Sequence, residues 1–93
     1  MKQSEKTIEK FTIQATADRG GKAVKFSSPA QRGVPDRIIL MPGGKVGFLE
    51  LKGDGGKATK LQLYWINLLQ DMGFQAAVAN SKESVINFLD ELC

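Results

Sequence analysis

The amino-acid sequence predicts one small α/β domain whose elements follow the order αβββαβα. Three stretches carry apolar residues at helical spacing behind a serine or threonine that can cap a helix, and four short β-rich runs separate them. The 93 residues suit one domain of ordinary globular composition, with 42% hydrophobic and 25% charged residues. We therefore expect residues 1–93 to fold as a single domain with a small core.

The first half of the chain predicts a helix and then three strands. The helix begins after Ser4 and ends at Gly20-Gly21, because apolar residues recur between them at helical spacing: Ile8, Phe11 and Ala15. The strand candidates are residues 23–26, 37–41 and 46–52. The turn Pro42-Gly43-Gly44-Lys45 predicts a hairpin between the second and third strands.

The second half predicts a helix, a strand and a last helix. Thr59 can cap a helix that ends at Gly73 and carries an apolar stripe of Leu61, Trp65, Leu68 and Met72. A strand is expected over 75–79, after which Ser81 caps a helix with an apolar stripe of Val85, Phe88, Leu89 and Leu92. We expect both stripes to form core.

Composition excludes several kinds of catalysis. The chain has no histidine and one cysteine, Cys93. It therefore has no imidazole base, no histidine-containing zinc site and no internal disulfide. Any catalysis must use carboxylates, lysine and a hard cation that prefers oxygen ligands.

Charge is distributed unevenly along the chain. Residues 1–60 hold twelve basic and six acidic residues, whereas 61–93 hold one basic and four acidic residues. This asymmetry is typical of a surface that faces phosphate, although a solvated basic surface would show it too. No apolar run is long enough to span a membrane and the N-terminal residues contain no apolar signal core, so we expect a cytoplasmic protein without a membrane partner.

Asp36, Glu50 and Lys52 are the candidate catalytic residues. Alternation along a strand places Glu50 and Lys52 on one face, where they could also form an ordinary ion pair. A three-residue or bulged turn at Gly43 would set Asp36 opposite Glu50, whereas a strict Gly-Gly turn would pair Asp36 with Leu51.

Two carboxylates that meet in this way repel each other unless a cation lies between them. With the carbonyl of Leu51, they suit Mg²⁺ or Mn²⁺. Lys52 could hold or deprotonate a water and offset charge on a phosphate, so the set predicts metal-assisted phosphodiester hydrolysis.

The spacing Pro35-Asp36, thirteen residues, then Glu50-Leu51-Lys52 resembles the signature of the PD-(D/E)XK nucleases. The surrounding segments resemble one branch of that superfamily, the VRR-NUC domain, and do so along essentially the whole chain. These segments are Phe26-Ser27-Ser28-Pro29, Gly33-Val34-Pro35-Asp36-Arg37, Met41-Pro42-Gly43-Gly44, Phe48-Leu49-Glu50-Leu51-Lys52 and Thr59-Lys60-Leu61-Gln62.

The resemblance implies a restriction-endonuclease-like core, with a central mixed sheet flanked by helices, in a stand-alone domain of the phage-encoded type that acts in a bacterial host cell. It implies that Asp36 and Glu50 bind metal, that Lys52 is the catalytic lysine and that Gln62 orients the lysine, water or phosphate. A further metal-binding carboxylate comes from the first helix, where Glu9 fits best and Glu5 is the alternative.

Basic residues around the motif are candidates for contacts with the DNA backbone. Lys25 and Arg37 are the best placed of a set that also includes Arg32, Lys45, Lys57 and Lys60. The aromatic residues are expected to pack, with Phe26 and Phe48 in the core, so no base-stacking platform is predicted. No P-loop is present, and we expect no nucleotide cofactor.

The sequence thus predicts a metal-dependent, structure-specific DNA endonuclease that acts as a homodimer on branched DNA, in the manner of a Holliday-junction resolvase. A non-catalytic DNA-binding module is one alternative. A flap or single-strand nuclease within a replication complex is another, and an interaction protein with a surface ion pair is a third.

Overall fold

The fold is a four-stranded mixed sheet with helices on both sides, and the computed structural model describes residues 2–93 of it. The elements follow the predicted order αβββαβα. They are α1 (Glu5–Asp18), β1 (Lys22–Lys25), β2 (Arg37–Met41), β3 (Lys45–Leu51), α2 (Lys60–Asp71), β4 (Gln75–Ala79) and α3 (Lys82–Leu92). Ser4, Thr59 and Ser81 cap the three helices, as the sequence predicts. None of the helices described in residues 2–93 is long and apolar enough to cross a bilayer.

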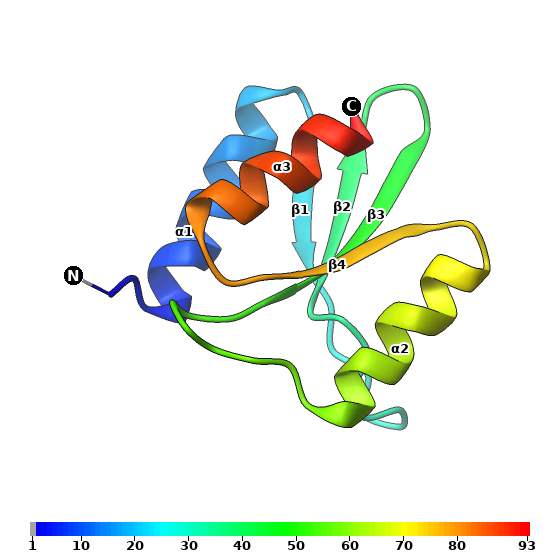
Figure 1. Cartoon of the computed structure of the whole chain (residues 1–93). Coiled ribbons are helices and arrows are strands. Elements are labelled where there is room, and N and C mark those ends of the chain that lie inside the picture. Colours follow the sequence, from blue (N-terminus) through cyan, green and yellow to red (C-terminus); the bar gives the residue numbers. More distant parts are fainter. Residues whose placement is uncertain (1) are drawn as a thin grey trace.

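The strands lie in the order β1-β2-β3-β4. The first three pair antiparallel, whereas β4 pairs parallel with β3 after the chain has crossed over through α2. Figure 1 shows α1 and α3 together on one side of the sheet and α2 on the other. We call the first side the α1/α3 face and the second the site face.

The core lies on the α1/α3 face, between the sheet and the helices α1 and α3. Ile8 of α1 and the predicted stripe of α3 pack here against inward-facing strand residues, which include Ile39, Leu49 and Leu51. Gly47 leaves room for this packing, because a Cβ at that position would lie 2.7 Å from the ring of Phe88. Burial of these apolar side chains is the main source of stability for so small a domain.

The apolar stripe of α2 is not core, contrary to the sequence prediction. Leu61 and Met72 are 46% and 63% exposed, and Ile66 is the buried residue of this helix. The reason is tertiary: α2 packs against β4 at the edge of the sheet and against β3 beside it. One flank of the helix is therefore left uncovered.

The hairpin between β2 and β3 has a three-residue turn, because Met41 pairs with Lys45. Gly43 and Gly44 both have positive φ, 85° and 75°, which L residues with a side chain rarely adopt. This turn is the first of the two alternatives that the sequence leaves open. It decides which side chains meet at the other end of the hairpin.

Candidate active site

Asp36 and Glu50 lie opposite each other on the site face. The register pairs Arg37 with Leu49, so the next pair outward is Asp36 with Glu50, whose Cβ atoms are about 5 Å apart in this arrangement. Asp36 Oδ1 also accepts a hydrogen bond of 3.1 Å from the backbone N–H of Leu51. If Glu50 and Lys52 formed only a surface ion pair of an interaction protein, Asp36 would be expected far from Glu50. The structure instead places the two carboxylates opposite each other.

Burial makes the two carboxylates costly to ionise. Glu50 is only 5% exposed, and burial together with repulsion from Asp36 raises its pKa to about 7. Burial also raises the pKa of Asp36, against the opposing effect of the Leu51 hydrogen bond. A buried acid and a half-buried acid at this spacing create a strong negative potential, which is the condition for binding a divalent cation.

Lys52 partly offsets this charge. Its Nζ lies 3.7 Å from Glu50 Oε2, and its side chain is 20% exposed. The positive charge lowers the pKa of Glu50, but burial and Asp36 outweigh it. Because the ammonium group is reachable from solvent, it can also contact a phosphate or a water on the site face.

Gln62 is held by the first turn of α2 so that its amide points at Glu50. Thr59 and Gln62 form a capping box, in which the backbone N–H of Thr59 donates to Gln62 Oε1 at 2.9 Å. The opposite end of the amide, Nε2, donates to Glu50 Oε2 at 3.3 Å. Thr59 therefore orients a site residue, and the spacing Thr-x-x-Gln in the sequence is the signal that could have revealed this role.

Arg37 lies on the other side of the sheet from the carboxylates. Side chains alternate along β2, so Arg37 shares the α1/α3 face with Ile39 and is 5% exposed. Its Nη2 forms an ion pair of 2.7 Å with Glu9 Oε2 of α1. A buried guanidinium needs such a partner, so the structure commits Arg37 to Glu9 and not to solvent, where DNA would be met.

Glu5 is the α1 carboxylate that acts on the acidic pair. Its charge contributes to the raised pKa values of both Asp36 and Glu50. The chain after β3 passes the start of α1, where a Cβ on Gly53 would lie 2.9 Å from Glu5 N and the N–H of Asp54 donates to Gln3 O (Figure 1). Within residues 2–93, however, no three acidic, cysteine or histidine side chains are close enough to form a metal site.

The other basic candidates are spread around the site. Lys25 is paired with Arg37 in the register, which puts it on the α1/α3 face, and Lys45 lies at the opposite end of β3. Arg32, Lys57 and Lys60 are exposed in the loops and the helix end that border the carboxylates. The sequence prediction therefore mixed residues from both faces of the sheet, because only the register separates them.

The loop of residues 26–36 is fastened to α2. Trp65 Nε1 donates to the carbonyl of Arg32 at 2.9 Å, and Gly33, with a φ of 87°, packs directly on Leu61. Trp65 thus helps to fix the loop that leads into Asp36, a task beyond the packing that the sequence predicts. Phe26, expected in the core, is 38% exposed at the start of this loop.

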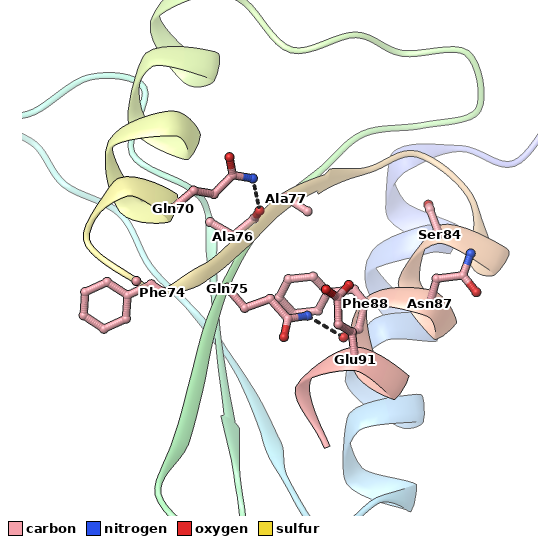
Figure 2. Close-up of a pocket in the computed structure, with 10 residues that line it drawn as sticks. Gln70, Phe74, Gln75, Ala76, Ala77, Ser84, Asn87, Phe88 and Glu91 are labelled. Atoms are coloured by element: carbon pink, nitrogen blue, oxygen red, sulfur yellow. Dashed lines mark hydrogen bonds between the residues drawn. The ribbon is translucent and has the colours of Figure 1, made fainter.

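A cavity of about 660 Å³ lies elsewhere, along the outer edge of β4 between α2 and α3. Figure 2 shows Gln70 and Gln75 at this edge, where their amides donate to the carbonyls of Ala76 and Phe88 at 2.8 and 2.7 Å. The two hydrogen bonds satisfy a backbone carbonyl of the edge strand β4 and a backbone carbonyl of α3. None of the residues that line this cavity belongs to the predicted site. The Asp36–Glu50 pair is therefore a better candidate for the active site than the cavity is.

The raised pKa of Glu50 predicts a specific pH dependence of stability. The folded protein binds this proton more tightly than the unfolded chain, so the contribution of Glu50 to stability falls as pH rises from about 4.5 to about 7. We expect Glu50→Gln to raise the free energy of unfolding by about 1–3 kcal/mol at pH 8 and to leave it nearly unchanged at pH 4.5. Urea titrations in metal-free buffer measure this, with Glu91→Gln on the exposed side of α3 as the matched control. An equal effect at both pH values would contradict the assignment.

Comparison with known proteins agrees with the fold and the motif. The VRR-NUC domain family matches residues 5–83. A protein of Acyrthosiphon pisum secondary endosymbiont phage 1, named "Putative nuclease p44", is 42% identical over 79 residues, which cover 85% of each chain. A solved structure described as a VRR_NUC domain superposes with a TM-score of 0.87 at 24% identity, covering 96% of this chain and 97% of the other. With most of its length matched by the family and its fold shared with a solved example, the chain belongs to the VRR-NUC domain family.

Proposed function

We propose that this domain is a metal-dependent nuclease that hydrolyses phosphodiester bonds in branched DNA. The observation that carries the proposal is the pair formed by half-buried Asp36 and buried Glu50, with Lys52 and Gln62 both directed at Glu50. Such a pair lowers stability unless a cation is bound, so its presence suits a binding role better than a structural one. Membership of a nuclease-type family and the name of the phage relative support the same activity.

Mg²⁺ or Mn²⁺ is the proposed cofactor, and the donor set fits it. Asp36, Glu50 and the backbone carbonyl of Leu51 would hold the ion. The Leu51 N–H points to Asp36, and in an extended strand the carbonyl of the same residue points to the same side. When bound, the cation supplies charge stabilisation at the phosphate and acidifies a coordinated water.

The remaining residues orient the reactants. Lys52 would donate to the attacking water or to a non-bridging phosphate oxygen, and Gln62 would keep Glu50 in place through its fixed amide. Attack in line with the P–O3′ bond leaves a 5′-phosphate and a 3′-hydroxyl. Arg32, Lys57 and Lys60 border the site and would bind the phosphate backbone without reading sequence.

A branched substrate follows from the small recognition surface. The basic residues that border the site are few and contact phosphates at most, so shape is a more accessible feature for this domain than base sequence. A four-way junction of the Holliday type is the proposed substrate. Symmetric cutting of two strands requires two copies of the site, and residues 2–93 contain one opposed carboxylate pair of this kind, Asp36 with Glu50.

Cleavage assays test the nuclease activity. Junctions, flaps, single strands and linear duplex should be incubated with Mg²⁺, Mn²⁺ or EDTA, and we expect cutting of the junction with either cation and none in EDTA. Asp36→Ala should lower the rate at least about a hundred-fold, since it removes a cation ligand. Asp54→Ala, an exposed acid in the next loop, is the matched control.

Each other outcome of this assay points to a different function. Binding of DNA without cleavage in any cation would favour a non-catalytic DNA-binding module. Preferred cutting of flaps or single strands would favour a nuclease that acts within a replication complex. Undiminished cleavage by Asp36→Ala would remove the proposed site.

We propose that the α1 carboxylate that acts on the cation is Glu5 and not Glu9, and that it acts through its charge without joining the ligands Asp36, Glu50 and Leu51. Glu9 already neutralises Arg37 at 2.7 Å, whereas Glu5 is exposed and acts electrostatically on Asp36 and Glu50. Glu9→Gln should lower the free energy of unfolding by about 1–3 kcal/mol, because Arg37 stays buried without a counter-charge. Glu5→Gln should leave stability unchanged and weaken Mg²⁺ binding, measured as the Mg²⁺-dependent rise in melting temperature. The assignment fails if the two variants exchange these effects.

We also propose that the domain is a homodimer that associates through the uncovered flank of α2. This flank presents Leu61, Tyr64 and Met72, which are 46%, 57% and 63% exposed. Light scattering coupled to size-exclusion chromatography should give twice the mass of one chain. Met72→Glu, at the end of α2 remote from Gln62, should give the monomer with an unchanged circular dichroism spectrum. A monomeric wild type at all protein concentrations would contradict the proposal.

A further inference from the structure

Phe26 lies directly beside the candidate catalytic pair. Its backbone N–H donates to the carbonyl of Asp36 at 2.9 Å, which continues the register of β1 and β2 by one residue. Directly opposed residues of an antiparallel pair have side chains on the same face, with Cβ atoms about 5 Å apart. Phe26, Asp36 and Glu50 therefore form one row across the site face.

The ring of Phe26 is available at the end of this row. It is 38% exposed, although the sequence pattern predicts a core residue, and α2 covers the site face at the opposite side, over β3 and β4. The loop that follows Phe26 is held at its far end by Trp65 and Gly33. The loop that begins at Phe26 is thus held at both ends, while Phe26 itself stays partly exposed.

The ring of Phe26 is within reach of a nucleoside bound at the row. Neighbouring residues of the row have Cβ atoms about 5 Å apart, so a sugar and base that extend toward the Asp36 side from a phosphate held by Asp36 and Glu50 would meet Phe26. Ser27 and Ser28 follow Phe26 in the chain, and their hydroxyl groups suit an approaching phosphate backbone.

We infer that Phe26 is a specificity-determining residue whose ring stacks on an unpaired base next to the scissile phosphate. Every base has a π-face, so stacking recognises an unpaired base without reading its identity. In a continuous duplex each base is already stacked on its neighbours, whereas a branch point offers a free face. The inference rests on the proposed nuclease function and names the feature by which that site selects branched DNA over duplex.

Cleavage kinetics of Phe26 variants form the first test. Phe26→Ala should lower kcat/KM on a junction about 5- to 100-fold, the loss expected for one base–aromatic stack, and should lower any cleavage of linear duplex by a smaller factor. Phe26→Trp should retain the preference for the junction, whereas Phe26→Leu, which keeps apolar bulk without the π-face, should lose most of it. Phe74→Ala is the matched control, because Phe74 is 43% exposed and packs on Phe48 away from the carboxylates.

Fluorescence of 2-aminopurine gives a readout that does not need cleavage. With the probe in the junction strand next to the scissile phosphate and EDTA present, wild-type protein and Phe26→Trp should quench the probe on binding. Phe26→Ala and Phe26→Leu should quench it less, while Phe74→Ala should act as wild type. The fluorescence measurement separates the two proposals. The nuclease proposal fails if the wild-type protein never cleaves DNA, whereas the stacking inference fails if Phe26→Ala and Phe26→Leu quench the probe as fully as wild type does.

Two results would overturn the inference. One is a loss in Phe26→Ala that is no larger than the loss in Phe74→Ala. The other is full junction preference and full quenching in Phe26→Leu, which would make the ring only an apolar filler. Melting temperatures of all variants identify any that fail to fold, and the conservative pair Phe26→Trp and Phe26→Leu decides the question if Phe26→Ala is one of them.

Discussion

The register between β2 and β3 is the constraint on which the site depends. Two glycines with positive φ close a three-residue turn, and this turn length places Asp36 opposite Glu50. A shift of one residue would turn Asp36 to the other face of the sheet, because side chains alternate. Three further residues lie at this end of the sheet. Lys52 comes directly after β3, Gln62 of α2 donates to Glu50, and Phe26, directly after β1, lies beside Asp36 in the same row.

The placement of Asp36 opposite Glu50 favours the proposed function but lowers the stability of the fold. Glu50 and Asp36, whose pKa values are raised by burial, destabilise the domain at neutral pH, and the core that must offset them is small. The two faces of the sheet divide the task. The α1/α3 face carries the apolar core and the Arg37–Glu9 pair, which ties α1 to β2, while the site face carries the groups with the strongest electrostatic conflict. Stability on one face thus supports a destabilising arrangement on the other.

The sequence predicts correctly those features that depend only on residues close together in the chain. Ser4, Thr59 and Ser81 cap the helices, and the stripe of α3 is buried as its spacing predicts. The prediction failed where the outcome depends on a neighbour. The similar stripe of α2 is partly exposed because that helix packs against the edge of the sheet, and Phe26, which looks like a core residue, is 38% exposed just beyond β1.

The sequence by itself determined the order of elements and the membership of a nuclease-type family, because these follow from residue identity and spacing along the chain. Only the tertiary structure decided which charged residues share a face. Asp36 and Arg37 are neighbours in the chain, yet one faces Glu50 and the other is buried against Glu9. The physical reason is that strand pairing and helix docking are long-range contacts, so they sort adjacent side chains into different environments that local spacing leaves open.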